Sequence, residues 1–445
     1  MARKSLTPKQ SLFVGITLFS MFFGAGNLIL PPLLGLQAGA SAVPAMAGFL
    51  VTGIGLPMLG IIAVGLVGTI RELASRVHPV FAHVFVAAVY LAIGPCLAIP
   101  RTSSTSFEMF EPLLPATVSL ETARLVFSVA FFAVALLLAM HPNALTKLLG
   151  RITGPALIVL LVFVIGSALF DPAPSLPAAQ GAYAAAPAMS GFLTGYQTMD
   201  LLASLTFGIV IAANIRELGI TDDGGLVREV SRAGVFAGLL MGVIYCGLAV
   251  VGVNIAADLS GATNGAEILA ASAGAHFGTA GTVVVAVIFL LACLNVCIGL
   301  ISCCGSYFAD EFPRVPYRAW AIGFAVFSCA VSNFGLDAIL TFSVPLLNAL
   351  YPMAIVLVLM GMMHKVCDCY PLMWPWTVGL TGFVSVVTSM RDAFFPGTAL
   401  PGFDAAPLAD VGMGWLAPAI FGVLLGAVTS LADKDRGEKA LRTKG

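Results

Sequence analysis

The chain has 445 residues, of which 59% are hydrophobic and only 10% are charged, and its mean hydropathy is +1.01. Soluble globular domains do not have this composition, so the sequence predicts an integral membrane protein. The net charge of −1 gives no sign of nucleic-acid binding, and the spacing of the nine cysteines does not indicate a disulfide framework.

The apolar stretches predict how often the chain crosses the membrane. A hydrocarbon core about 30 Å thick requires about 20 apolar residues per helical span. The first stretch is too long for a signal peptide and lacks a small-residue cleavage site, so it is interpreted as a span. The sequence predicts an all-α polytopic protein with 12 transmembrane helices, at about 11–36, 43–69, 79–99, 122–140, 152–170, 187–214, 232–254, 280–306, 319–336, 338–362, 374–390 and 412–432.

The basic residues predict the orientation of these spans. If the N-terminus is inside, 18 of the 21 Lys and Arg residues fall in inner segments. Only Arg101, Arg124 and Arg391 fall in outer segments. Because Lys and Arg collect in cytoplasmic loops, we expect both termini in the cytoplasm, including a tail at 433–445.

Two spans contain several helix-breaking or polar residues close together. They are GAGN at 24–27 in span 1 and GYQTMD at 195–200 in span 6, whereas isolated prolines, such as Pro95 in span 3, are expected only to kink their helices. Since the two broken spans are five apart, we expect inverted repeats at about 11–170 and 187–362 within one membrane domain. Two additional helices at about 374–432 would follow.

Asp200 is the one Asp, Glu, Lys or Arg that the sequence places well inside a predicted span. An ionisable side chain at that depth costs about 2.5–3.5 kcal/mol, so a functional role is the first hypothesis. The alternative is that Asp200 only caps the half-helix that continues to Asn214.

The glycines of GAGN allow the backbone to leave helical geometry and to approach a ligand closely. The outer half-helix, from about Asn27 to Gly35, would then present N–H groups to an anion. Carbonyl groups near Ser20 and Phe23 would face a cation. The alternative is a simple kink, or a small-residue contact with a neighbouring helix.

Three long stretches carry a resemblance to a known family: GAGNLILPPLLG from residue 24, IGPCLAIPRTSS at 93–104 and GYQTMDLLASLTFGIV at 195–210. With these motifs the chain resembles, along its whole length, the bacterial branched-chain amino acid:cation symporter family. The resemblance implies a leucine-transporter-type fold with broken helices 1 and 6 around a central amino acid. It also implies uptake of leucine, isoleucine and valine across the bacterial cell membrane, with Na⁺ as the usual coupling ion.

The resemblance also implies a site. It assigns the substrate carboxylate to the backbone of Gly24, Ala25 and Gly26, with Asn27 serving a cation beside it. The substrate ammonium would lie at Gly195, Tyr196, Gln197 and Thr198, or at Asp200. The apolar slot for the substrate side chain would use Tyr90, Tyr196, Met199 and Phe207.

One position departs from the pattern that sodium-coupled relatives show. Where a pair of hydroxyl residues is usual on span 8, this chain has Asn295 and Val296, and valine has no side-chain oxygen. Asn295 can still offer an amide oxygen, and Ser302 lies two turns further on the same face. We therefore expect Na⁺ at Ser20, Phe23, Asn27, Asn295 and Ser302, with proton coupling through Asp200 as the alternative.

Other functional classes find little support in the sequence. The five histidines are scattered over different spans and loops, so no cluster typical of an enzyme is present, and HKVCDC at 364–369 is a weak metal-binding pattern. No Walker motif is found. We expect no cofactor, and as partners only the amino acid, the coupling cation and the lipid bilayer. A sensor that binds amino acids without moving them stays open, and the sequence does not fix the oligomeric state.

Overall fold

The structure is a computed structural model that describes residues 5–115, 117–140, 148–170, 176–220, 222–256, 259, 261–262 and 264–442. These residues form helices and turns and contain no strand. Arg3, Lys4, Lys147 and Lys444, which the sequence assigns to the cytoplasmic side, lie outside the described residues.

The first half of the chain begins with two short helices that together occupy the first predicted span. The helices up to residue 169 are α1 (Pro8–Phe22), α2 (Ala25–Ala38), η1 (Gly39–Ser41), α3 (Ala42–Leu50), η2 (Val51–Gly55), α4 (Leu56–Val67), α5 (Ile70–Ser75), α6 (Pro79–Leu91), η3 (Ala92–Cys96), α7 (Ala98–Phe110), η4 (Glu111–Leu113), α8 (Leu120–Ala139), η6 (Leu149–Thr153) and α10 (Gly154–Leu169).

The second half also begins with a divided span, formed by α12 and α13. Its helices are α11 (Ala182–Ala185), α12 (Pro187–Tyr196), α13 (Asp200–Glu217), α14 (Asp223–Ile255), α15 (Gly265–Phe277), α16 (Thr279–Glu311), α17 (Tyr317–Ser332), α18 (Leu336–Met362), α19 (His364–Cys367), α20 (Met373–Phe394), α21 (Pro401–Asp404), η7 (Ala409–Val411) and α22 (Leu416–Arg442).

Each of the twelve predicted ranges is largely helical in the described part of the chain. By length and composition, eight helical stretches there could cross a membrane, or nine if α12 and α13 form one bent span. One of the eight, Ala25–Val67, is 43 residues long because α2, α3 and α4 follow one another almost without interruption. The count of twelve crossings therefore stays a prediction.

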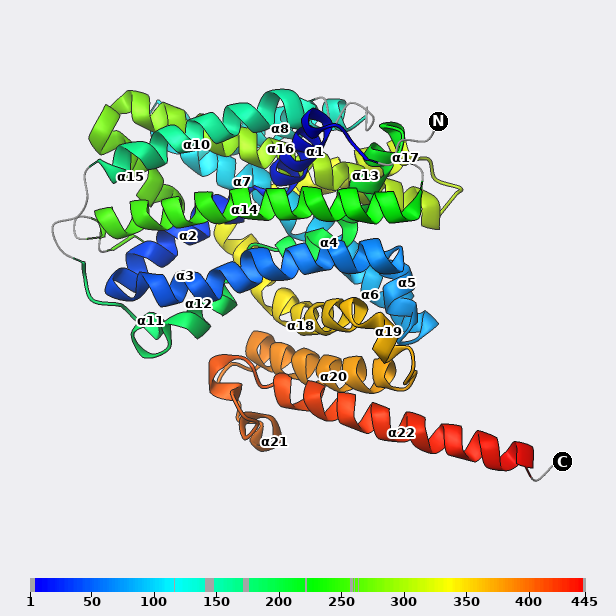
Figure 1. Cartoon of the computed structure of the whole chain (residues 1–445). Coiled ribbons are helices and arrows are strands. Elements are labelled where there is room, and N and C mark those ends of the chain that lie inside the picture. Colours follow the sequence, from blue (N-terminus) through cyan, green and yellow to red (C-terminus); the bar gives the residue numbers. More distant parts are fainter. Residues whose placement is uncertain are drawn as a thin grey trace.

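The two divided spans lie side by side in the middle of the bundle. α1 contacts α13, α14 and α16, and α2 contacts α7, α12 and α14. Figure 1 shows α20 and α22 along one edge of the bundle, next to α18, so these two C-terminal helices lie beside the central helices rather than among them.

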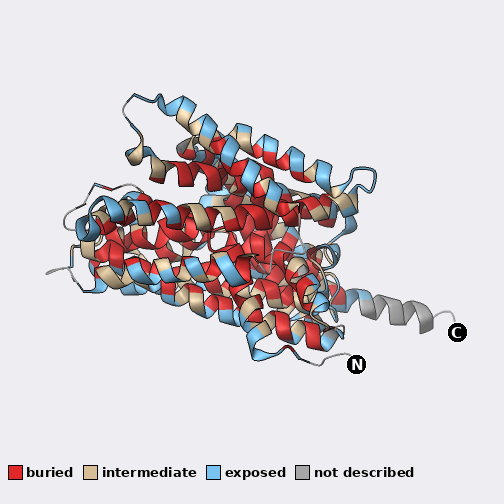
Figure 2. Ribbon diagram, turned by 90° about the horizontal axis from the view of Figure 1, so that it is seen from above, coloured by how far each residue is buried: buried red, intermediate tan, exposed pale blue. Residues whose placement is uncertain are grey.

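Burial is arranged as expected for a helical membrane protein. Figure 2 shows buried residues in the centre of the bundle and exposed residues on its outer helix faces. Many of the exposed side chains are large and apolar, including Val43, Val243 and Phe342, each more than 70% exposed. Such a surface matches a surrounding lipid phase, while the backbone polar groups are satisfied within the helices.

Span 3 differs from its prediction. We expected Pro95 only to kink a helix ending near residue 99, but the helix unwinds around it: Gly94 has non-helical dihedral angles (φ −91°, ψ −126°), and a new helix, α7, starts at Ala98. The third span therefore continues to Leu113. This extension carries Arg101 into the bundle, where it is only 4% exposed, so its assignment to an outer loop was wrong.

Candidate functional site

The break in span 1 lies at Phe23 and Gly24, where both residues leave helical geometry. Asn27 stabilises the start of the second half-helix, because its Oδ1 accepts a hydrogen bond from the Gly24 N–H at 3.1 Å. Gly24 has little room for a side chain, since a Cβ there would lie 2.8 Å from Cγ2 of Val296 on α16. The predicted break at 24–27 is thus found, starting one residue earlier.

The break in span 6 lies between Tyr196 and Asp200, and the two half-helices are bent by 44°. Met199 has a left-handed backbone (φ 66°), which costs a residue other than glycine about 1–2 kcal/mol. Thr198 supports the turn: its hydroxyl donates to the Gly195 carbonyl at 2.9 Å and accepts from the Asp200 N–H at 3.3 Å. Strain of this kind persists where the surrounding structure fixes it, often at functional sites.

Asp200 links the two breaks. Its Oδ2 accepts hydrogen bonds from the Asn27 amide at 2.7 Å and from the Tyr245 hydroxyl at 3.2 Å. The Asn27 amide also donates to the Tyr245 hydroxyl. All three side chains are buried, so one network of charge-assisted hydrogen bonds connects α2, α13 and α14.

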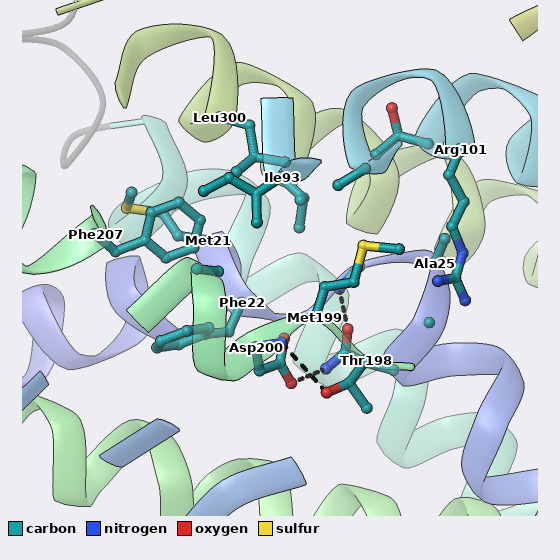
Figure 3. A pocket seen from close by; sticks show the side chains of 17 residues that line it. Met21, Phe22, Ala25, Ile93, Arg101, Thr198, Met199, Asp200, Phe207 and Leu300 are labelled. Carbon is teal, nitrogen blue, oxygen red and sulfur yellow. Dashed lines mark hydrogen bonds between the residues drawn. The ribbon is translucent and has the colours of Figure 1, made fainter. Parts of the chain in front are cut away.

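A small cavity of about 40 Å³ lies where the two breaks meet. Figure 3 shows Asp200 and Thr198 near Met199 on one side of it, and Phe207, Met21 and Leu300 on another. The cavity has space for only a few water molecules, so it must widen before an amino acid can enter. Its wall is lined by Met21, Phe22, Gly24, Ala25, Gly26, Asn27, Ile93, Ala98, Arg101, Thr102, Thr198, Met199, Asp200, Ala203, Phe207, Val296 and Leu300.

Arg101 also lines this cavity, and sequence reasoning missed it. It lies on α7 just after the break of span 3, and its Nη1 donates to the Gln197 carbonyl at 2.9 Å. The prediction ended span 3 near residue 99 because the following PRTSSTS run reads as a polar loop. The signal that could have found Arg101 is the Gly-Pro pair at 94–95, because glycine permits non-helical geometry and proline removes a helix hydrogen bond.

The predicted substrate residues do not all reach the cavity. Gly24, Ala25, Gly26, Thr198 and Asp200 line it. Gly195 instead packs against η2, since a Cβ there would lie 1.9 Å from the Thr52 hydroxyl. Tyr196 and Gln197 line a second cavity of about 240 Å³ beside α18, α20 and the segment 403–415.

Two of the four residues predicted for the apolar slot are in the cavity wall. Met199 and Phe207 line it, together with Ile93, Val296 and Leu300. Tyr90 packs elsewhere, with its ring stacked 4.0 Å from that of Tyr307. Tyr196 stacks on Tyr351 at 4.7 Å.

The predicted cation residues are spread over a wider region than the cavity, and among them only Asn27 lines it. The Ser20 hydroxyl donates to the Leu149 carbonyl at 3.4 Å, and the Phe23 ring stacks on Phe19. Asn295 and Ser302 are buried on α16, and in the described part of the chain their side-chain polar atoms have no hydrogen-bond partner.

Solved structures with a similar fold are transporters. Mhp1, a nucleobase-cation-symport-1 family transporter in a closed conformation with bromovinylhydantoin bound, superposes with a TM-score of 0.62 at 11% identity, covering 96% of this chain and 95% of its own. The manganese transporter of Eremococcus coleocola gives a TM-score of 0.59 at 14% identity, with the same coverage. At these identities the likeness shows the fold alone, which is the expected leucine-transporter type.

Sequence relatives are much closer. The branched-chain amino acid permease BraB of Bacillus subtilis (strain 168) is 37% identical over 432 residues, covering 96% of this chain and 97% of the permease. The branched-chain amino acid transport system 2 carrier protein of Pseudomonas aeruginosa is 38% identical over 418 residues, covering 94% of this chain and 95% of the carrier. These relatives are permeases and carriers, so the expectation that the chain is not an enzyme is confirmed. Since residues 7–433 also match the family described as branched-chain amino acid transport protein, the chain belongs to that family.

Proposed function

We propose that this protein imports leucine, isoleucine and valine across the bacterial cell membrane by symport with a cation, with Na⁺ as the first candidate ion. Both termini would lie in the cytoplasm. One observation carries the proposal: a cavity at the meeting point of two helix breaks combines a buried carboxylate with a largely apolar wall. Broken helices around a site at mid-membrane are typical of secondary transporters.

The cavity wall suggests how a branched-chain amino acid would lie. First-turn N–H groups of α2, at Ala25 and Gly26, lack helical partners and favour the substrate carboxylate. Asp200 and the region of Thr198 would hold the ammonium group. The aliphatic side chain would lie against Ile93, Phe207 and Leu300, which give contact surface without polar groups that need partners.

The sodium site stays a proposal based on residue chemistry. Asn295 and Ser302 carry buried oxygens without a hydrogen-bond partner in the described residues, and unsatisfied buried polar atoms cost about 1–3 kcal/mol each. A cation held with help from the carbonyls near Ser20 and Phe23, and by Asn27, would satisfy such atoms. Oxygen ligands of this kind suit Na⁺, as they suit other hard cations.

Proton coupling is the second candidate, and two observations favour it. Asp200 receives its hydrogen bonds from neutral donors, so a proton on the carboxyl group would not break an ion pair within 4.0 Å among the described residues. Val296 places methyl groups, not an oxygen, against the backbone of Gly24.

Either ion can drive accumulation. A tenfold concentration gradient contributes about 1.4 kcal/mol, and a potential of 100 mV contributes about 2.3 kcal/mol for one charge. Together they support an accumulation of several hundredfold at one ion per substrate. Rocking of one helix bundle against the other would alternately open the cavity to the two sides.

The experiment is uptake of labelled isoleucine into proteoliposomes of the purified protein. An inward Na⁺ gradient is compared with an inward proton gradient and with no gradient. Accumulation driven by Na⁺ alone supports the sodium site, and accumulation driven by protons alone supports Asp200 as the proton carrier. Binding of isoleucine without accumulation under any gradient would contradict symport and would indicate a sensor.

A further inference from the structure

Arg101 gives the central cavity a positive charge opposite in sign to Asp200. Among the described residues that line the cavity, Arg101 is the one cation and Asp200 the one anion. A charged side chain within a membrane bundle costs about 2.5–3.5 kcal/mol unless partners compensate for lost hydration. The partners of Arg101 therefore indicate what the guanidinium does.

Among the described residues, Arg101 uses little of its hydrogen-bonding capacity. A guanidinium has five N–H donors, and the one hydrogen bond to a described residue runs from Nη1 to the Gln197 carbonyl at 2.9 Å. Nε is buried without a partner, and no described carboxylate lies within 4.0 Å of the guanidinium. A buried cation in this setting favours an anion, because the anion would satisfy both the charge and the N–H groups.

Nη2 of Arg101 lies beside the start of α2. A Cβ on Gly26 would lie 3.1 Å from Nη2 of Arg101 and 3.3 Å from the Gln197 carbonyl oxygen. Figure 3 shows the Arg101 side chain extending toward Ala25. Because Asn27 already occupies the Gly24 N–H, the N–H groups of Ala25 and Gly26 stay available in the first turn. Two groups that favour an anion thus meet beside Gly26.

We propose that Arg101 binds the α-carboxylate of the substrate together with the first turn of α2, and that recognition requires this carboxylate. The inference rests on the proposed function and names a further specificity-determining residue for it. The guanidinium fork suits a carboxylate because it can form two parallel hydrogen bonds. Asp200, on the other side of Thr198 and Met199 in Figure 3, remains available to the ammonium group.

The test is a cycle that removes the substrate carboxylate and the guanidinium separately. Isothermal titration of the purified full-length protein compares isoleucine with isoleucinamide, which keeps the ammonium and the side chain. Arg101→Gln and Arg101→Lys are titrated in the same way. Arg124→Gln is the matched control, because Arg124 lies on α8 over the Phe107 ring and does not line the cavity.

The wild-type protein is expected to bind isoleucine at least tenfold more tightly than isoleucinamide. Arg101→Gln should weaken isoleucine binding about 10- to 150-fold, the value for a hydrogen bond to a charged group, and leave isoleucinamide binding nearly unchanged. The affinity of Arg101→Lys for isoleucine should lie between those of the wild type and Arg101→Gln, because lysine keeps the charge and loses the planar guanidinium. Arg124→Gln should match the wild type.

A folded Arg101→Gln protein that keeps the full preference for isoleucine overturns the role of Arg101 while leaving the proposed function intact. Equal wild-type affinities for isoleucine and isoleucinamide overturn it as well, and this comparison requires no variant to fold. A wild-type protein that binds neither ligand and accumulates no isoleucine contradicts the proposed function itself.

Discussion

Gly24, between α1 and α2, lies close to Val296 on α16. A Cβ at this position would lie 2.8 Å from a methyl group of Val296, and a valine side chain has few alternative rotamers. Overpacking of this kind costs about 1–3 kcal/mol. We expect Gly24→Ala to lower the initial rate of isoleucine uptake at least tenfold, and Gly24→Ala combined with Val296→Ala to recover part of it.

Gly323→Ala on α17 is the matched control, since a Cβ there has no atom within 4 Å, and its uptake should equal that of the wild type. If Gly24→Ala takes up isoleucine at the wild-type rate, or if adding Val296→Ala restores none of the lost uptake, the close approach of Gly24 to Val296 is not required for transport.

Asp200 is expected to act in coupling or in substrate binding. Asp200→Asn keeps the size of the side chain and removes the charge, so we expect gradient-driven accumulation of isoleucine to be lost. Asp222→Asn is the control for a purely capping role. Asp222 caps α14, where it accepts a hydrogen bond from the Gly225 N–H at 2.7 Å, and asparagine caps a helix about as well as aspartate does. Near-normal uptake by Asp200→Asn with unchanged ion dependence would leave Asp200 only a structural role, as the hydrogen-bond partner of Asn27 and Tyr245.

At the residue scale the sequence located the breaks and Asp200 but missed Arg101. Glycine clusters and a lone intramembrane acid can be recognised from the sequence, because such residues are unusual within an apolar helix. Arg101 is hidden by its neighbours: the hydroxyl residues 102–106 read as a loop, yet all are buried in α7, which packs against α16 and α17. Tertiary contacts, not local sequence, make that polar run helical.

At the element scale, the segment between α20 and α22 covers the second cavity, beside the break of span 6. Asp404 holds this segment to the end of α20: it accepts from the Leu400 N–H at 2.6 Å and pairs with Arg391. These groups, the Leu400 N–H first and the Arg391 guanidinium second, hold the pKa of Asp404 below its ordinary value of 3.8. Because the pKa of Asp404 is lowered, its contacts with Leu400 and Arg391 are fully present above the ordinary carboxyl pKa. They are lost as the pH falls through the lowered pKa of the folded protein.

We therefore expect the segment 400–412 to keep its conformation from neutral pH down to the ordinary carboxyl range, and to loosen only below it. Asp404→Asn should loosen it at neutral pH, seen as faster amide hydrogen exchange there and not in α20. Asp410→Asn, an exposed carboxyl group in the same segment, is the control and should change nothing. Unchanged exchange in Asp404→Asn would show that the ion pair does not order this segment.

Helix positions were more predictable than helix ends. Long apolar runs gave the location of each predicted span, because hydrocarbon thickness sets a minimum length. The polar continuation of span 3 and the helix α15, at Gly265–Phe277, were not predicted, since their stability depends on packing against neighbouring helices. Asn295 and Ser302 show the same limit: their spacing on α16 is predictable, but their distance from the central cavity is not.

At the scale of the whole molecule, symport of a neutral amino acid with one cation moves one net charge. An inside-negative potential of 100 mV then contributes about 2.3 kcal/mol, or about 50-fold in accumulation. We expect a potassium diffusion potential imposed with valinomycin to raise isoleucine accumulation in proteoliposomes by this order. Proteoliposomes without the protein are the control, and accumulation that ignores the potential would contradict one-cation symport.

We propose that the branched-chain amino acid binds in the cavity between the two breaks. A structure of the protein with isoleucine bound would show the position of the substrate. We expect a widened cavity with the carboxylate at Gly26 and Arg101, the ammonium group near Asp200, and the side chain against Ile93, Phe207 and Leu300. Isoleucine bound elsewhere, with the cavity between the breaks still closed, would contradict it.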